Sequence, residues 1–350
     1  GQKPVRALGK VGAPPITDIA SSLDADSPIV LVDATTGERH SFFAELDQQA
    51  VDPANRNLIV HPGANLLEGH RYVVAMRDLV AVGGAPIEPT EQFRALRDGT
   101  VTDAPHLEGR RGHYEQLFGE LATAGVARDD LLIAWDFTVA SADSLAGRML
   151  HIRDDAFADL GSASPEFVVD TVENDVDASV ARRVTGRFFV PNYLTGTGEP
   201  GSTFVYGADG LPVRNGTFTA DFQCNVPHSV LGEGDAVTPA RPVVYGHGLL
   251  GSRDEINASN IDAMTNEHDM IYCATDWEGM SEEDVLTALG ILQDMSKFPQ
   301  LADRVQQGIL NTLFLGRMMI HADGLASDPA FQGAGGAALI DRSELYYDGN

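Results

Sequence analysis

Residues 241–251, with the sequence RPVVYGHGLLG, constrain the fold of this 350-residue chain more than any other segment. An apolar run leads into closely spaced glycines, which predicts a buried β-strand followed by a tight turn. Because glycine has no Cβ, such a turn can bring backbone N–H groups close to a reacting group. In a strand-to-helix turn these N–H groups can stabilise an oxyanion. The segment therefore predicts an α/β fold with an anion-stabilising loop at the end of a strand.

From residue 241 onward, strand patterns alternate with helical patterns, as is typical of a parallel α/β sheet. Strands are expected at residues 243–245, 270–275 and 345–347. Two helices are expected, at residues 282–295 and from Pro299 onward. Their expected apolar faces are Val285, Leu289, Leu292 and Met295 for the first, and Leu301, Val305, Ile309 and Leu313 for the second. Between the first two strands, Ile256, Ile261 and Met264 have a spacing that fits a single helix poorly.

The first part of the chain, residues 1–146, has a mainly β pattern that suits a sandwich-like domain. Short apolar runs at residues 29–32, 57–60, 72–75 and 131–139 are expected to be strands. One helix is expected at residues 112–125, with an apolar face of Tyr114, Leu117, Phe118 and Leu121. Residues 67–72 resemble the tyrosine corner of immunoglobulin-like domains, which gives Tyr72 a structural role through a bond from its phenol to nearby backbone.

Residues 147–182 are expected to form a linker between this domain and a second one at residues 183–350, because the stretch 170–180 is acidic and polar. Its acidic residues are Asp170, Glu173, Asp175 and Asp177. They invite a calcium site, but the EF-hand spacing is not matched, so a solvated linker is favoured. Strands at residues 183–191 and 217–227 are expected to pair antiparallel and open a mixed sheet.

The charge balance of 24 basic against 51 acidic residues gives a net charge of −27, which argues against nucleic acid as a partner. Hydrophobic residues make up 43% of the chain, enough for folded domains. No apolar run has the length of a membrane span, and the first four residues lack the pattern of a leader peptide. The protein is therefore expected either to be cytosolic or to be numbered after a removed leader.

The sequence has two cysteines, Cys224 and Cys273, on either side of the strand that begins at Arg241. Neighbouring strands of one sheet can bring them together, so a disulfide and two buried thiols both remain open. The ten histidines show neither an H-E-x-x-H motif nor spacing with paired cysteines, and no metal site or cofactor is expected.

Acyl transfer needs a nucleophile, a base with its orienting acid, and N–H donors for the developing negative charge. In the loop 246–251, the Leu249 N–H is the expected oxyanion donor, and Gly248 is expected to hold the turn. His247 is expected to anchor the loop and border the substrate pocket rather than act as a base. The alternative is an ordinary glycine-rich turn.

Asp276 and Trp277 follow the expected strand 270–275, at the strand end where open α/β sheets bind ligands. They can line an acyl pocket. Alternatively, Asp276 caps a turn and Trp277 packs under the loop.

Three motifs, GHGLLG at 246–251, ATDWEGM at 274–280 and YYDGN at 346–350, make the chain from about residue 183 resemble the N-terminal half of an α/β-hydrolase core. The preceding region resembles the N-terminal β-domain of large bacterial lipase and esterase-like proteins, with residues 131–141 similar to its closing strand. The resemblance implies hydrolysis of carboxylic esters, hydrophobic or polymeric ones among them, with Leu249 in the oxyanion hole. It also implies a bacterial protein that is secreted or displayed at the cell surface.

The nucleophile of that family lies in a G-x-S-x-G elbow. No serine of this chain has glycine both two residues before it and two residues after it. Gly349-Asn350 matches the start of such an elbow, so a serine is expected directly after Asn350. A second polypeptide is expected to carry it together with the rest of the core. Self-cleavage after Asn350, through the serine hydroxyl or through cyclisation of the asparagine amide, competes with proteolysis by another enzyme and with a fragment. The alternative function is a binding or adhesion protein with a degenerate hydrolase scaffold.

Overall fold

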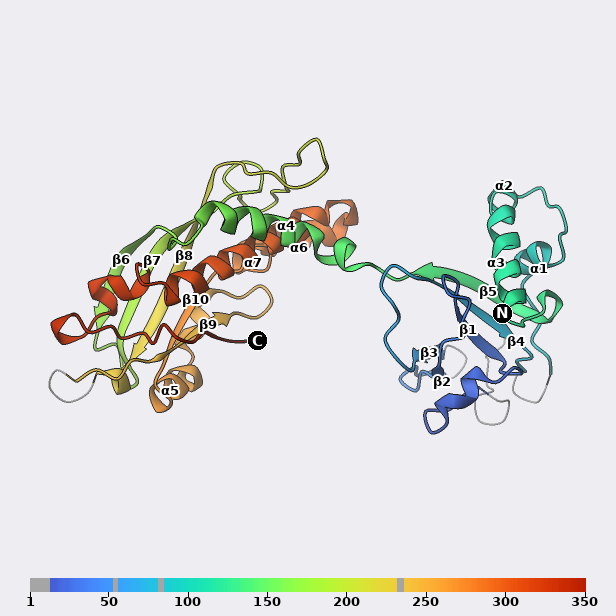
Figure 1. Ribbon diagram of the computed structural model, residues 1–350, viewed down its shortest axis with the longest axis horizontal. Coiled ribbons are helices and arrows are strands. Elements are labelled where there is room, and N and C mark those ends of the chain that lie inside the picture. The colour runs from blue at the N-terminus through green and yellow to red at the C-terminus, as the bar shows by residue number, and fades with distance from the viewer. Residues whose placement is uncertain (1–12, 53–55, 81–84, 232–235) are drawn as a thin grey trace. The chain divides into compact units, whose positions relative to one another are not determined.

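The computed structural model describes residues 13–52, 56–80, 85–231 and 236–350, and the chain divides into two compact units, Gly1–Leu145 and Ala146–Asn350 (Figure 1). Residues 1–4, on which the expectation about a leader rests, lie outside the described residues. Within the described ranges, no helix is both long and apolar enough to cross a membrane.

The first unit contains two small antiparallel sheets and three α-helices within its described residues. Its strands are β1 (Ile29–Asp33), β2 (Phe42–Leu46), β3 (Leu58–Pro62), β4 (Arg71–Arg77) and β5 (Leu131–Thr138). Its α-helices are α1 (Glu91–Arg97), α2 (Pro105–Glu108) and α3 (Arg111–Thr123). One sheet has the order β1-β4-β5, and β2 pairs with β3 in the other. The strand and helix expectations for this region are confirmed.

The three-stranded sheet is covered on both faces, and side chains that alternate along β1 reach both covering layers. Val30 and Val32 of β1 pack with α1 and α3, whereas Ile29 and Leu31 pack with β2 and β3. The four residues expected on the apolar face of α3 are all buried. The expectation of a mainly β sandwich is therefore wrong for one layer, because helices rather than a second sheet cover that face.

Tyr72 has the structural role expected of it. It is 1% exposed, and its phenol oxygen accepts a hydrogen bond from the Leu67 N–H at 3.0 Å. This bond closes the turn that leads into β4, as in a tyrosine corner.

The second unit is built on a six-stranded sheet with the order β11-β9-β10-β8-β7-β6. Its strands are β6 (Phe167–Asn174), β7 (Val180–Pro191), β8 (Thr217–Pro227), β9 (Arg241–Gly246), β10 (Met270–Thr275) and β11 (Tyr346–Gly349). β9 runs parallel to both β10 and β11, whereas β6, β7 and β8 pair antiparallel. The predicted mixed sheet is thus present, with its parallel part at the β11 edge.

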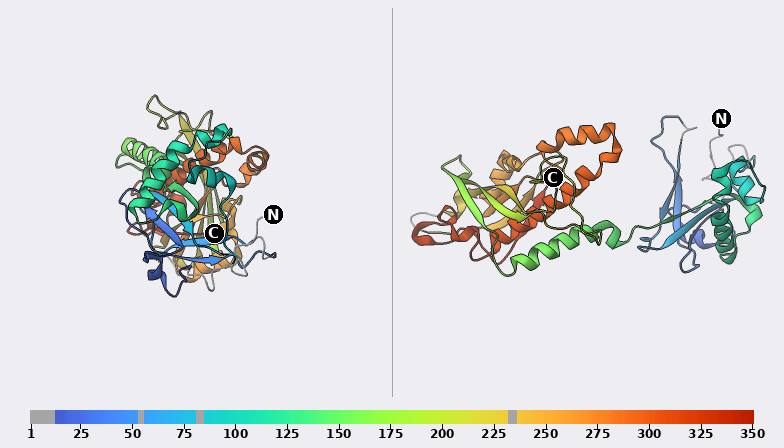
Figure 2. Two further views of the ribbon diagram at one scale, coloured as in Figure 1. Left: turned by 90° about the vertical axis from the view of Figure 1, so that its right-hand side faces the viewer. Right: turned by 90° about the horizontal axis from the view of Figure 1, so that it is seen from above.

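The second unit has four α-helices in its described residues, and helices pack on both faces of its sheet. They are α4 (Ala142–Leu160), α5 (Ser259–Glu267), α6 (Val285–Gln293) and α7 (Pro299–Ile320). α4 and α7 run along one face of the sheet (Figure 2), and the ring centroids of Phe157 and Phe314 lie 5.0 Å apart. On the other face, Ile261 of α5 packs with Val243 and Tyr272. The 3₁₀ helix η5 (Arg253–Asn257) precedes α5, so the segment with the poor helical spacing is two short helices.

The expected linker at residues 147–182 is wrong, because these residues belong to the second unit. They form most of α4, all of β6 and the start of β7. Asp170 pairs with Arg187 at 2.9 Å, and the Asp177 carboxylate accepts the N–H groups of Ser179 and Val180. The acidic side chains therefore close a β-hairpin and balance an arginine instead of forming a mobile tether.

The apolar faces predicted for the last two helices are also wrong, although both helices form. In α6 only Ile291 is buried, whereas Leu289 and Leu292 are 52% and 75% exposed. In α7 the buried side includes Asp303, Arg304, Gln307 and Asn311 beside apolar residues. Polar side chains, most of them bonded to groups outside the helix, thus occupy a helix face that a hydrophobic pattern assigns to solvent.

Cys224 and Cys273 lie directly opposite each other on β8 and β10 and form a disulfide. Both are fully buried in the core between the sheet and α7. Of the two alternatives left open by the sequence, the structure contains the bonded pair.

Candidate functional site

The loop after β9 lies at the carboxyl ends of the parallel strands, beside the end of β11. Gly246 pairs with Gly349, and the Asn350 N–H donates to the Gly246 carbonyl at 3.1 Å. A Cβ on Gly349 would lie 2.4 Å from the Gly246 oxygen, so only glycine fits there. The structure therefore brings together the two segments that the sequence singled out, residues 246–251 and Gly349-Asn350.

Three of the four backbone N–H groups from Gly248 to Gly251 donate hydrogen bonds, one to a side chain and two to carbonyls. The Gly248 N–H donates to the Glu255 carboxylate, the Leu250 N–H to the Met280 carbonyl and the Gly251 N–H to the Gly248 carbonyl. Within the part of the chain that the structure describes, the Leu249 N–H has no acceptor. Leu249 is the residue expected to donate to an oxyanion.

Leu250 has a φ of +59°, in the left-handed region that non-glycine residues rarely adopt. Such strain persists only where surrounding contacts hold it, and it clusters at functional sites. Here the Leu250 N–H bond to Met280 and the Glu282 N–H bond to the Gly251 carbonyl hold it, at 2.7 and 2.8 Å.

His247 is buried and structural, so it does not line an open pocket. Its Nδ1 lies 2.8 Å from the Gly248 carbonyl, and its Nε2 accepts the Trp277 N–H at 2.8 Å. These bonds require a neutral ring protonated on Nδ1, because Nε2 must accept while Nδ1 donates. Both nitrogens are occupied, which fits the expected anchoring role.

Asp276 bonds to the first residue of η5 and does not face a cavity. Its carboxylate accepts the Arg253 N–H at 2.8 Å and pairs with the Arg253 guanidinium. Arg253 also lies 3.3 Å from Asp221. The arrangement corresponds to the turn-capping alternative for Asp276.

Trp277 packs between the loop and α7. Its indole Nε1 donates to the Val305 carbonyl at 3.3 Å, and a Cβ on Gly308 would lie 2.4 Å from its ring. A glycine in α7 therefore makes room for the ring. This position corresponds to the alternative in which Trp277 packs under the loop.

Beneath the loop lies a cluster that sequence reasoning missed, the buried arginine cluster of Arg304, Glu278 and Asp284. Arg304 is 1% exposed and pairs with both carboxylates, with Nε 2.8 Å from Asp284. Asp284 also accepts the N–H groups of Gly279 and Ser281. Burial raises the pKa of Glu278 to about 8, and the charge of Arg304 opposes this rise only in part. The cluster holds residues 278–284, to which the loop is bonded.

Glu255 is the second residue that the sequence did not reveal. Its two carboxylate oxygens each lie 3.1 Å from the Gly248 nitrogen, and one lies 2.9 Å from Asn350 Nδ2. Nothing in the sequence pattern separates it from the neighbouring acidic Asp254.

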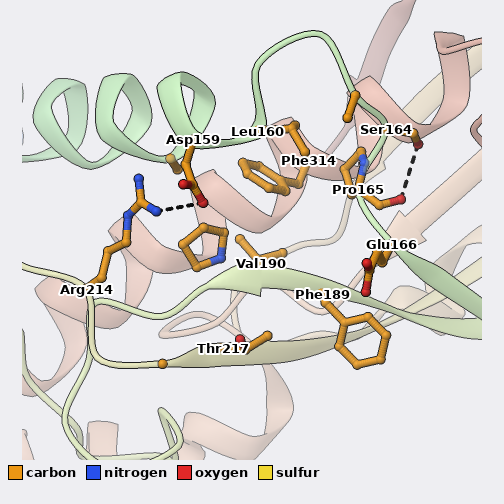
Figure 3. Close-up of a pocket in the computed structure, with 14 residues that line it drawn as sticks. Asp159, Leu160, Ser164, Pro165, Glu166, Phe189, Val190, Arg214, Thr217 and Phe314 are labelled. Atoms are coloured by element: carbon orange, nitrogen blue, oxygen red, sulfur yellow. Dashed lines mark hydrogen bonds and ion pairs between the residues drawn. The ribbon is translucent and has the colours of Figure 1, made fainter.

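A cavity of about 390 Å³ lies elsewhere in the second unit, between α4, the end of β7 and the start of β8 (Figure 3). None of its lining residues belongs to the loop 246–251. Arg214, which borders it, pairs with Asp155 and Asp159 at 2.6 and 2.7 Å. The positive charge of Arg214 is thus already matched by two carboxylates.

Among the described residues, no group of three or more histidine, cysteine, aspartate or glutamate side chains is placed to hold a metal ion. The candidate site therefore consists of a backbone N–H donor, its supporting loop and the adjacent end of β11.

No family model matches this chain, and no curated protein matches it in sequence. Among solved structures it is similar to a protein from Bacteroides fragilis described as an acetyl xylan esterase. That match has 11% identity and a TM-score of 0.32, and it covers 57% of this chain and 46% of the other. It is also similar to the rice cell wall degrading esterase LipA from Xanthomonas oryzae. There the identity is 13%, the TM-score 0.18 and the coverage 38% of both chains, and a ligand-bound form of LipA gives 12% identity. The chain spans less than half of each of these proteins.

Proposed function

We propose that this chain supplies the oxyanion loop of a carboxylic-ester hydrolase. The observation that carries the proposal is the Leu249 N–H, which has no acceptor within the described residues, while the N–H groups of Gly248, Leu250 and Gly251 are bonded and the loop lies beside the end of β11. When a nucleophile attacks an ester carbonyl, the carbonyl oxygen gains negative charge, and a fixed N–H donor stabilises it. Leu249 has that role in the proposal.

The strand order supports an α/β-hydrolase core. The last five strands of the chain are β7, β8, β9, β10 and β11. Across the sheet they lie in the order β7-β8-β10-β9-β11, so the third and fourth strands along the chain exchange places. This is the order of α/β-hydrolases up to the nucleophile elbow, and in that fold the loop after the third strand supplies an oxyanion donor. The third strand corresponds to β9 and the fifth to β11.

In the proposal, the nucleophile is a serine that follows Asn350, either on the same polypeptide or at the start of a second one. β11 is an edge strand, and its Tyr346 and Tyr347 are 45% and 60% exposed. An open edge with apolar side chains favours pairing with a further strand, which the rest of the core would provide. Intact mass and N-terminal sequencing test the split form. A second chain that begins with serine supports self-cleavage, and one uncut chain contradicts it.

Hydrophobic esters are the proposed substrates, since Leu249 itself is 79% exposed beside its free N–H. Hydrolysis of a chromogenic short-chain ester, blocked by a serine-directed phosphonate, tests the activity. Absence of both hydrolysis and labelling would contradict it. The proposed location outside the cytosol is supported by the Cys224–Cys273 disulfide, because such bonds persist in oxidising compartments.

A second candidate, a binding or adhesion protein, is favoured by one feature of the first unit. Ile133, Trp135 and Phe137 alternate along the edge strand β5 and are 41%, 37% and 38% exposed. An exposed apolar stripe is a feature of interaction surfaces. Retained binding without any serine labelling would favour this candidate.

A further inference from the structure

We propose that Glu255 is a positioning residue that clamps the oxyanion loop, leaves the Leu249 N–H as its free donor and fixes Asn350 at the end of β11. The inference rests on the proposed function and adds a residue that the hydrolase motifs do not contain.

The clamp is made by one carboxylate that bonds to both segments. Both oxygens of Glu255 lie 3.1 Å from the Gly248 nitrogen, and one also accepts Asn350 Nδ2 at 2.9 Å. Hydrogen bonds to an ionised acceptor are about twice as strong as those between neutral groups. Glu255 therefore connects the two segments between which the substrate carbonyl must lie.

The glycines around this carboxylate fit the same reading. A Cβ on Gly251 would lie 2.1 Å from a Glu255 oxygen, so the side chain occupies space that only glycine leaves open. Glycine gives the backbone more conformational freedom than any other residue. A loop with glycines at 246, 248 and 251 needs an outside contact to hold one conformation.

Glu255 is itself held in place by a rigid frame. It lies on η5, two residues after Arg253, whose backbone and guanidinium both bond to Asp276 at the end of β10. The Glu255 N–H donates to the Ser252 carbonyl, and its own carbonyl accepts the Ala258 N–H. The carboxylate position is thus set from the sheet.

The consequence is selection of one donor. Without Glu255 the Gly248 N–H would also be free, and the peptide between His247 and Gly248 could rotate and displace the Leu249 N–H that follows it. A misplacement of about 1 Å in a catalytic geometry costs roughly a hundredfold in rate. Glu255 fixes the Gly248 N–H, and the bonds from His247 Nδ1 and the Gly251 N–H to the Gly248 carbonyl fix the next peptide, which carries the Leu249 N–H.

The first test is independent of activity and uses this chain labelled with ¹⁵N-glycine. The Gly248 amide proton is expected to resonate downfield in the wild type and to move upfield in the Glu255→Gln variant. Asp254→Asn is the matched control, because Asp254 is exposed on the same helix and has no partner within the described residues. It should leave the resonance unchanged. An unshifted Gly248 signal in Glu255→Gln would overturn the clamp.

The second test measures ester hydrolysis by protein that contains the nucleophile. Glu255→Gln is expected to lower kcat about tenfold with KM unchanged, since it loosens a contact that matters only in the transition state. Asp254→Asn should leave both parameters unchanged. Wild-type kcat in an active Glu255→Gln enzyme would overturn the positioning role and leave the proposed function standing. An inactive wild type would contradict the proposed function and the catalytic role together, while the Gly248 signal still decides the clamp.

Discussion

Two arginines of the second unit each pair with two carboxylates, but in opposite surroundings. In the buried arginine cluster, Arg304 and Asp284 are 1% and 0% exposed. Beside the cavity, the Arg214 and Asp159 side chains are 31% and 63% exposed. Exposed ion pairs contribute little to stability, whereas breaking a buried one leaves an uncompensated charge. Only the buried cluster underlies residues that hold the loop 246–251, so burial, rather than the number of charges, distinguishes the two.

The two clusters also differ in the direction of their pKa shifts. A hydrogen bond from Arg214 lowers the pKa of Asp155, although partial burial opposes it. Burial raises the pKa of Glu278. The exposed pairing with Arg214 therefore favours the ionised form of Asp155, whereas burial disfavours the ionised form of Glu278.

Arg304→Met is expected to have the largest effect. It leaves Glu278 and Asp284 buried without their cation, and the free energy of unfolding should fall by about 3–5 kcal/mol. Urea unfolding followed by circular dichroism measures this. A loss below about 1 kcal/mol would place the buried cluster on a level with the exposed one.

The pH dependence of stability should distinguish the clusters next. The folded pKa of Glu278, about 8, lies above its ordinary value of 4.5, so the folded state retains a proton that the unfolded state releases. The contribution of Glu278 to the free energy of unfolding is therefore fully present below pH 4.5 and is lost as the pH rises through 8. Since one pKa unit corresponds to about 1.4 kcal/mol, the loss should amount to a few kcal/mol.

Unfolding measured from pH 5 to 8.5 should show this decline in the wild type and a flatter curve in Glu278→Gln. For Asp155 the sign is reversed. Its lowered pKa gives stability that is present above pH 3.8 and lost as the pH falls. Parallel wild-type and Glu278→Gln curves would contradict the role assigned to burial.

Gly308→Ala should have an intermediate effect. Its Cβ would lie 2.8 Å from the Glu278 backbone and 2.4 Å from Trp277, so α7 must move away from the segment that holds the loop. Overpacking of this kind costs about 1–3 kcal/mol. Gly290→Ala in α6 is the control, because its Cβ meets nothing within 4 Å. Thermal unfolding should show a lower Tm for the first variant alone.

Arg214→Met should have the smallest effect. Because the pair is exposed, the free energy of unfolding should change by less than about 1 kcal/mol. Ester hydrolysis should keep its wild-type kcat and KM. A large loss of activity would shift the candidate site toward the cavity of Figure 3.

Much of the secondary structure follows from local patterns in this chain. The strand 270–275 was predicted with its observed bounds, and α7 begins at Pro299 as expected. Alternating apolar residues and turn-forming glycines depend on near neighbours, and such signals are visible in the sequence. The sequence singled out residues 246–251 and Gly349-Asn350 separately, and they meet because parallel neighbouring strands end at the same edge.

The supporting residues of the site could not be predicted. Glu255 is one of two adjacent acids on η5, and only the path of the loop decides which one meets the Gly248 N–H. Arg304 lies on a stripe with Gln307 and Asn311, and such polar stripes usually face water. Here Arg304 is buried because the carboxylates of Asp284 and Glu278 pair with it, and Gln307 is buried because it bonds to Asn311 and to the Pro191 carbonyl.

By itself, the sequence determined that strand β9 ends in a glycine-rich loop and that helices alternate with parallel strands after it, since these follow from residue type and spacing. Only the tertiary structure decided which faces of α6 and α7 are buried and which N–H groups of the loop are bonded. It also decided that residues 147–182 form a helix and sheet strands instead of a linker. Most of those outcomes depend on partners far away along the chain, such as Arg304 with Glu278 and Asn350 with Glu255. Local patterns carry no record of such partners.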